Sequence, residues 1–237
     1  MFGIELEPSA WVAIVCVLVV IAIEGFSFYT KQQGGDDKPV VAPPAQIPCA
    51  SFLSNLEKRR AVKHFSPGPV DLKHIRRAIE NAPSSFGLQP YKIVVVTNQE
   101  KKAALRAVSF NQAQVEECHA LFVFCALNDV EKRMEEFITA TGSEGIRAMM
   151  KGFLDATPDK VAWAKRQAYI ALGFGLAAAA ETETASCPME GFIPDKVSEI
   201  LGLDANLSPC VFLAVGQPAG DEETPRFRFD DLIMEIA

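Results

Sequence analysis

The sequence predicts an α+β fold in which one central β-sheet is flanked by helices. Three apolar runs, at residues 92–96, 119–127 and 209–216, lack the alternation of half-exposed strands, so both faces of the sheet should be covered. Helical patterns outnumber these strands. Of the 237 residues, 49% are hydrophobic, which is enough for one good-sized core.

The helices are justified by their caps and their periodicity. Asp71 and Asn98 are suitable N-cap residues, Pro194 lies in the first turn of the last helix, and Gly202 stops it. The longest helical pattern is rich in Ala and Gly, which permits close packing at the centre of the fold. Helices are expected at residues 51–62, 71–82, 98–109, 128–140, 144–156, 159–181 and 194–203.

The N-terminal segment predicts a membrane anchor. Residues 8–23 carry no charge, and with Glu24 near an interface the run is long enough to span a bilayer. Trp11 and Tyr29 would then lie near the two boundaries. No basic residue precedes the run, unlike in a signal peptide. We therefore expect a transmembrane helix within residues 1–30, with a cleaved targeting segment or a buried helix as alternatives.

The rest of the chain is expected to form a linker and one domain. Residues 31–48 are rich in Gly, Pro and polar residues and have no period, so they predict a flexible linker. Residues 49–237 would form the domain. Basic residues follow the hydrophobic run and do not precede it, which favours a cytosol-like side of the membrane for this domain.

The composition argues against several classes of function. The net charge of −7 argues against nucleic-acid binding, which needs a basic face. The six cysteines form no CxxC pair and are expected to be small buried apolar residues. The three histidines have no ligand-like spacing to a cysteine, so we expect no metal site.

The sequence lacks the common catalytic motifs but offers candidate anion sites. There is no GxSxG elbow, P-loop or GxGxxG, and His119, at a strand start, is expected to be structural. Basic clusters at residues 57–65, 164–169 and 226–228 could hold a phosphate through charge-assisted bonds. The alternative is that each is an ordinary surface charge run. Residues 186–192 (SCPMEGF) contain a Pro-x-Glu-Gly turn straight after a short β-like segment, which could expose the backbone N–H groups of Glu190 and Gly191 to a ligand.

Six segments in order carry a resemblance to a known family. They are RRAVKHF, APSSFGLQPYKIVVV, FNQAQVEECHALFVFCA, WAKRQAYIALGFGLAAAAE, PMEGF and RFR. At this spacing, residues 55–235 resemble the FMN-dependent NAD(P)H nitroreductase family. The resemblance implies a nitroreductase-like central mixed β-sheet flanked by helices. It also implies a homodimer with FMN at its interface, contacted by both subunits.

The resemblance implies which residues contact the phosphate end of FMN. Arg59 and Arg60 occupy positions that meet the phosphate and the ribityl chain, and Arg226 and Arg228 match a basic pair on the phosphate. FMN carries a dianionic phosphate, so paired cations suit it in an acidic protein. Ala61 stands where many members have a serine, so one hydrogen bond to the phosphate is expected to be missing.

The resemblance implies a second set of residues around the isoalloxazine ring. Lys63 is expected at the pyrimidine side of the ring, and the turn of Pro83, Ser84 and Ser85 along the ring face. Asn111 is expected at the polar edge of the ring, and the turn of Pro188, Glu190 and Gly191 at its N5 region. Gln114 replaces a lysine of some members near the N1 edge, and Gly87 replaces a polar residue, which leaves the substrate range open. No catalytic side chain is expected, because the cofactor performs the hydride chemistry.

We therefore expect an FMN-dependent oxidoreductase that moves electrons from NAD(P)H to nitroaromatic or quinone-like acceptors. Two alternatives remain open at this point. One is a flavin-dependent reductive dehalogenase of the deiodinase kind, which also has an N-terminal anchor. The other is a membrane-tethered interaction module that keeps the fold without turnover.

Overall fold

The computed structural model describes residues 49–220, 225–229 and 231–236. The chain divides into two units, Met1–Gln46 and Ile47–Ala237, and every described residue belongs to the second. The segments predicted as an anchor and as a linker, residues 1–30 and 31–48, lie outside the described residues.

The described residues form one five-stranded sheet. Its strands are β1 (Phe65–Ser66), β2 (Tyr91–Val96), β3 (Ala120–Leu127), β4 (Ala185–Met189) and β5 (Leu207–Pro218). The strand order is β1-β5-β3-β2, and β4 also pairs with β5.

All strand pairs of this sheet are antiparallel, so the prediction of a mixed sheet is wrong. The described parallel contact is one isolated bridge between Ala61 and Ser186. Strand direction could not be deduced from the apolar runs, because a strand covered on both faces has the same pattern in either direction.

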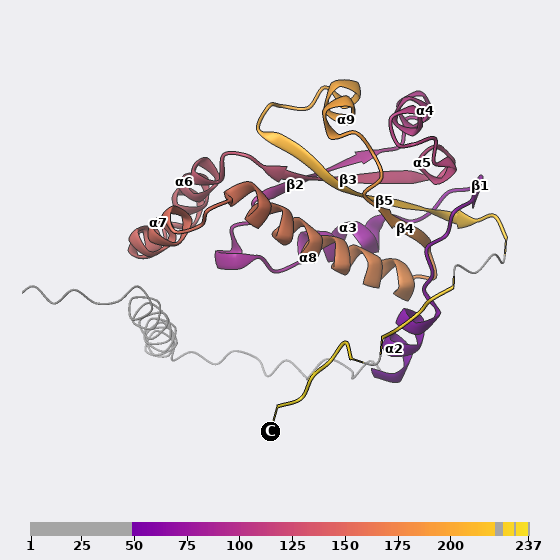
Figure 1. Ribbon diagram of the computed structural model, residues 1–237, viewed down its shortest axis with the longest axis horizontal. Helices are drawn as coiled ribbons and strands as arrows, with labels where there is room; N and C mark the ends of the chain where they lie inside the picture. Colours follow the sequence, from indigo (N-terminus) through magenta and orange to yellow (C-terminus); the bar gives the residue numbers. More distant parts are fainter. Residues whose placement is uncertain (1–48, 221–224, 230, 237) are drawn as a thin grey trace, which may run out of the picture. The chain divides into compact units, whose positions relative to one another are not determined.

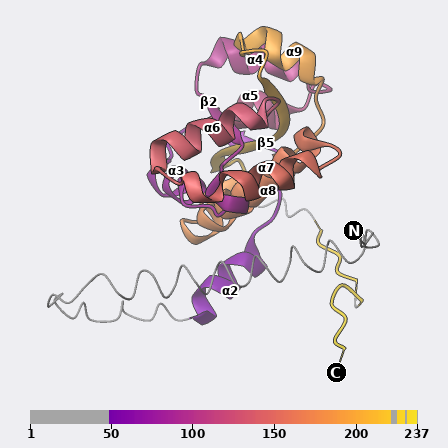
Figure 2. The ribbon, with the colours of Figure 1, turned by 90° about the vertical axis from the view of Figure 1, so that its left-hand side faces the viewer.

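Helices cover both faces of the sheet, as the strand pattern predicted. One face packs against α4 (Gln99–Ala107), α5 (Ala113–Glu117) and α9 (Pro194–Leu201). The other packs against α3 (Lys73–Glu80) and the long α8 (Lys160–Glu181). Figures 1 and 2 show α4 and α9 side by side on one face, with α3 and α8 on the other. Every residue of β3 is buried as a result.

A third cluster extends the core beyond the sheet. It joins α6 (Val130–Thr141) and α7 (Arg147–Asp155) to Trp163 at the start of α8 and to Leu88. A short 3₁₀ turn, η2 (Glu144–Ile146), leads into α7. In Figure 1 these two helices lie beyond one end of the sheet.

The predicted helix starts agree with the observed caps to within two residues. Asn98 accepts a hydrogen bond from the Lys101 N–H at 2.8 Å, and Asp71 accepts one from the Lys73 N–H at 2.8 Å. Helix α2 (Cys49–Lys58) ends four residues before the predicted limit, because the following residues extend toward the bridge at Ala61.

Within the described ranges, no helix is both long enough and apolar enough to cross a membrane. The longest, α8, has Lys165 and Arg166 within its sequence. This finding contradicts the membrane-anchored localisation predicted from the sequence.

Candidate functional site

The residues predicted to bind a cofactor fall into separate groups in the structure. The first group follows α2 and lies close to β4 and to Arg226; it consists of Arg59, Arg60, Ala61 and Lys63. A second group comes from residues 108–114 and 188–193, which lie against one another. The third is the loop of Pro83, Ser84 and Ser85. Arg228 is exposed.

The first group is an arginine cluster. The Arg226 guanidinium donates to the carbonyl oxygens of Arg59 at 3.0 Å and Leu56 at 3.3 Å, which brings the C-terminal segment to α2. Arg59 is half-buried, and its Nη1 atom is buried without a hydrogen-bond partner. Among the described ion pairs, none includes Arg59.

Burial lowers the pKa of the Arg59 guanidinium from its ordinary value, and the neighbouring Arg226 lowers it further. An arginine nevertheless keeps its proton at neutral pH. The positive charge therefore lacks both full hydration and an opposite charge. A bound anion would supply the missing acceptor.

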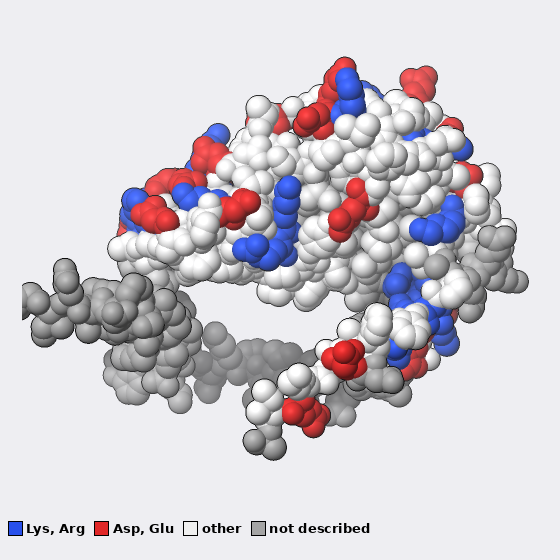
Figure 3. Space-filling model, viewed as in Figure 1, with Lys and Arg blue, Asp and Glu red and all other residues white. Residues whose placement is uncertain are grey.

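A cavity of about 300 Å³ adjoins this cluster. Its lining includes Arg59, Arg60 and Ser186, with Ala179 and Ala180 of α8, and one acidic residue, the exposed Glu183. The Ser186 Oγ atom is also buried without a partner. Two unpaired polar groups thus belong to residues that line the same cavity. In Figure 3 basic side chains gather over α2, at the lower right.

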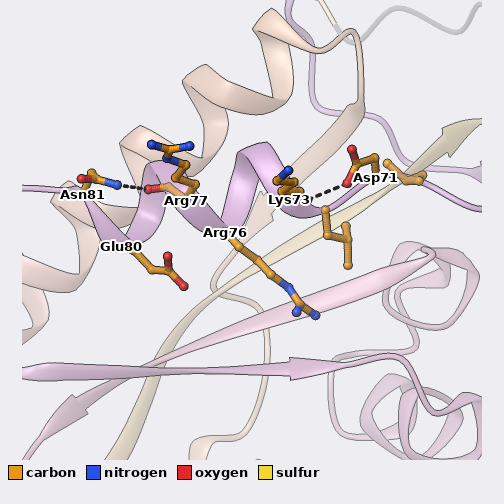
Figure 4. A pocket seen from close by; sticks show the side chains of 8 residues that line it. Asp71, Lys73, Arg76, Arg77, Glu80 and Asn81 are labelled. Atoms are coloured by element: carbon orange, nitrogen blue, oxygen red, sulfur yellow. Dashed lines mark hydrogen bonds between the residues drawn. The ribbon is translucent and has the colours of Figure 1, made fainter.

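A larger hollow lies elsewhere, along α3. It measures about 720 Å³ and is lined by residues 70–73, 76, 77, 80 and 81 (Figure 4). None of its lining residues has a buried polar side-chain atom without a partner in the described part of the chain. Lys73 N donates to Asp71, and the Asn81 side chain donates to the Arg77 carbonyl oxygen at 2.7 Å. No predicted site residue lines it. The smaller cavity is the better candidate, because its polar groups lack partners.

Lys63 lies over β4, where its Nζ atom is 3.6 Å from the Cys187 sulfur. Burial raises the pKa of the Cys187 thiol, and Lys63 opposes this effect. The thiol therefore stays neutral and acts as a weak acceptor that orients an exposed ammonium group.

The second group is held together by Gln112. Its amide nitrogen donates to the carbonyl oxygen of Gly191 at 2.8 Å, and Gln114 donates to the Gln112 side chain at 3.2 Å. A Cβ atom on residue 191 would lie 2.7 Å from the Gln112 nitrogen, so a larger residue there would displace the end of the Gln112 side chain. Ile193 N also donates to the Val108 carbonyl oxygen at 3.0 Å. The two segments thus form one surface.

Strained backbone lies next to this contact. Phe110 and Asn111 have φ values of 52° and 56°, in the left-handed region that residues other than glycine rarely adopt. The Asn111 side-chain oxygen accepts from Arg106 Nε at 2.9 Å, and the Phe110 side chain is 71% exposed. Such strain often marks a ligand-binding loop.

Glu190 is turned toward α8. The Tyr169 hydroxyl donates to its carboxylate at 2.5 Å. Burial first, and then the bond to Glu190, raise the pKa of Tyr169. The carboxylate therefore has a fixed partner, which leaves the backbone of the turn as the group available to a ligand.

The loop of Pro83, Ser84 and Ser85 is fixed to a different part of α8. The Ser85 N–H donates to the Gln167 side chain at 2.9 Å, and the Ser84 hydroxyl accepts from Gln89 N at 2.8 Å. Gln167 lies twelve positions before Ala179, at the arginine cavity, and this corresponds to about 18 Å along the helix axis. Within one copy of the chain, the serine turn and the arginine cluster are apart.

Several residues of these groups were not predicted from the sequence. They are Gln112, Gln167, Tyr169, Ser186 and Cys187, and each contacts a predicted residue or lines the same cavity. The FNQAQ segment held a signal for Gln112. The others are brought to the site by contacts distant in sequence.

This chain is similar to known proteins in sequence and in fold. The sequence model of the nitroreductase family matches residues 56–217. A Thermus thermophilus protein named NADH dehydrogenase is 35% identical over 195 residues, covering 78% of this chain and 94% of its own length. A Staphylococcus haemolyticus protein named as an NAD(P)H nitroreductase is 30% identical over 193 residues, covering 70% and 88%. A crystal structure of a nitroreductase family protein from Streptococcus pneumoniae has a TM-score of 0.69 at 27% identity, covering 78% of this chain and 100% of that one.

Proposed function

The chain belongs to the nitroreductase family, whose members are FMN-dependent oxidoreductases, and on this premise we propose that it reduces nitroaromatic or quinone-like acceptors. NAD(P)H is the electron donor and FMN the cofactor. The acceptors are inferred from the chemistry of a flavin that gives electrons to flat, electron-poor molecules.

The observation that carries the proposal is the buried Nη1 atom of Arg59, which has no hydrogen-bond partner in the described part of the chain. Buried polar groups are nearly always hydrogen-bonded, and an unpaired one costs about 1–3 kcal/mol. Here a charged group is left without a partner beside two further arginines, Arg60 and Arg226. The phosphate of FMN supplies the charge and the acceptors that this cluster lacks.

The ring end of the cofactor fits the surface made by residues 108–114 and 188–193. The backbone of Glu190 and Gly191 would meet the ring there, with Asn111 and Gln114 beside it. Gln112 holds this surface by its bond to Gly191, and Cys187 orients Lys63 at its border. When bound, FMN would supply the hydride chemistry, while these residues bind and orient it. No side chain is assigned as an acid or a base.

A second copy of the chain would complete the site. The serine turn and the arginine cluster are about 18 Å apart along α8, so one copy does not bring both to one ligand. The side of α8 between them carries the half-exposed apolar residues Ile170 (40%) and Phe174 (41%), four positions apart. A two-fold dimer that buries this side would place the turn of one subunit near the arginines of the other.

The test is the visible absorption spectrum of the purified full chain before and after NADPH without oxygen. A flavin spectrum that bleaches, followed by recovery on addition of a quinone or a nitroaromatic compound, is the expected result. Bleaching without recovery with either acceptor would refute the acceptor assignment. A colourless protein that cannot be reconstituted with FMN would refute the proposed function.

A further inference from the structure

Ser186 is an unusual buried residue. It is 1% exposed, and its hydroxyl oxygen has no hydrogen-bond partner. A serine hydroxyl inside a protein normally finds an acceptor, because an unpaired one is unfavourable compared with a methyl group of similar size. A serine at this position therefore calls for a reason beyond packing.

The position of Ser186 places it beside the arginine cluster. Ser186 lines the cavity that Arg59 and Arg60 also line, and Arg59 has the second unpaired buried atom there. The Val62 N–H donates to the Ser186 carbonyl oxygen at 3.1 Å, which fixes β4 against the segment that carries the arginines. Successive residues of a strand face opposite sides, so Cys187 packs in the core and contacts Lys63 while Ser186 faces the other way.

The neighbour of Ser186 across the bridge has no hydroxyl. Ala61 and Ser186 form the isolated parallel bridge, and paired residues of neighbouring strands have side chains on the same face. The backbones of Ala61 and Ser186 therefore lie next to each other, and the residues that flank Ala61, Arg60 and Val62, line the cavity. Ala61 cannot donate the hydrogen bond to the phosphate that a serine at this position would make. The Ser186 hydroxyl can donate it instead.

We propose that Ser186 donates a hydrogen bond from its hydroxyl to the phosphate of FMN, together with Arg59. This inference rests on the proposed function, because FMN is the source of the phosphate. A phosphate monoester has several acceptor oxygens, so it can accept from both unpaired groups at once. No other polar group in the described part of the chain bonds to the Ser186 hydroxyl.

The test compares FMN with riboflavin, which has the same ring but no phosphate. In the full-length apoprotein, Ser186→Ala should weaken FMN binding about 10-fold to 100-fold, as expected for one hydrogen bond to a charged group. Riboflavin binding should not change. The melting temperature of the apoprotein should stay the same or rise, because an unpaired hydroxyl has been removed. If Ser186 served only to stabilise the fold, Ser186→Ala would lower the melting temperature of the apoprotein.

A second variant moves the hydroxyl across the bridge. Ala61→Ser combined with Ser186→Ala should recover part of the lost preference for FMN over riboflavin. Ser186→Cys keeps the size of the side chain, but a thiol is a weak donor, so this variant should bind FMN as weakly as Ser186→Ala. It replaces the alanine variant if that variant does not fold.

The possible results separate this inference from the function on which it depends. Wild-type protein that binds FMN, with variants that keep the full preference for FMN over riboflavin, would overturn the role of Ser186 alone. Wild-type protein that binds inorganic phosphate but neither flavin would overturn the proposed function and this inference together. Loss of FMN and riboflavin affinity by the same factor would also overturn it, because the effect would not depend on the phosphate.

Discussion

Two arginines of this protein, Arg147 and Arg59, have opposite surroundings. Arg147, at the start of α7, donates through Nε and Nη2 to both carboxylate oxygens of Glu144, at 2.8 and 2.9 Å, and through Nη1 to Glu135. These bonds raise its pKa above the ordinary value. Arg59 has no carboxylate partner among the described ion pairs, and its pKa is lowered by burial and by a second arginine.

The difference shows that the absence of a partner indicates a ligand site better than the presence of a charge does. Arg59 lies in a basic stretch of sequence and Arg147 does not, but a count of basic residues does not show which guanidinium has a partner. Arg147 has no need of a ligand, because two acidic side chains neutralise it at the surface. Arg59 is partly removed from water without compensation, which is stable only if something else binds there.

The strongest test of this comparison is to remove the unpaired cluster. Arg59→Ala with Arg226→Ala should weaken FMN binding by about 1,000-fold, since two charge-assisted bonds to the phosphate are lost. The matched control is Arg147→Ala, which removes an arginine with partners and should leave FMN binding unchanged. Titration of apoprotein with FMN, followed by flavin fluorescence, measures both. Equal losses of FMN affinity in the double variant and in Arg147→Ala would mean that FMN binding depends only on the net charge of the protein.

A second experiment gives the Arg59 cluster a nearby carboxylate, as Arg147 already has. Ala61→Asp places a carboxylate beside the cavity, where it can neutralise the cluster and repel a phosphate. Repulsion between nearby charges predicts FMN binding about 100-fold weaker. The melting temperature of the apoprotein should rise. Ala61→Asn has the same size without the charge and serves as the control; a similar loss in that variant would point to steric exclusion.

A smaller effect is expected from inorganic phosphate alone. At about ten times its Kd, phosphate should stabilise the apoprotein by about 1.4 kcal/mol and raise its melting temperature by about 3–5 °C. The shift should disappear in Arg59→Ala and persist in Arg147→Ala. Chloride at matched ionic strength is the control. A shift of equal size in the Arg59 variant would place the anion elsewhere.

Much of the fold could be predicted because its signals are local. Caps such as Asn98 and the uniform apolar runs of β2 and β3 depend on adjacent residues, and the observed elements agree with them. The short α5 was not predicted, because five residues give too little periodicity to recognise. The antiparallel pairing was also not predicted, because it depends on how the connections between strands return across the sheet.

The site was predicted only where the resemblance supplied it. Motif residues such as Arg59 and Gly191 are recognisable in sequence, but the residues that hold them are not. Tyr169 meets Glu190 across 21 positions, and Gln167 meets Ser85 across 82. The left-handed backbone at Phe86, with φ of 58°, is equally hidden, since phenylalanine rarely adopts it.

The position of β5 in the sequence has a consequence for synthesis of the protein. This strand pairs with β1, β3 and β4, yet it is the last of the described strands to be translated. Before residues 207–218 emerge from the ribosome, β3 has β2 on one edge and an open edge on the other, with apolar side chains on both faces. Open apolar strand edges readily pair with other chains. The nascent chain is therefore most exposed to aggregation just before β5 appears, and its sheet closes only after β5 has been made.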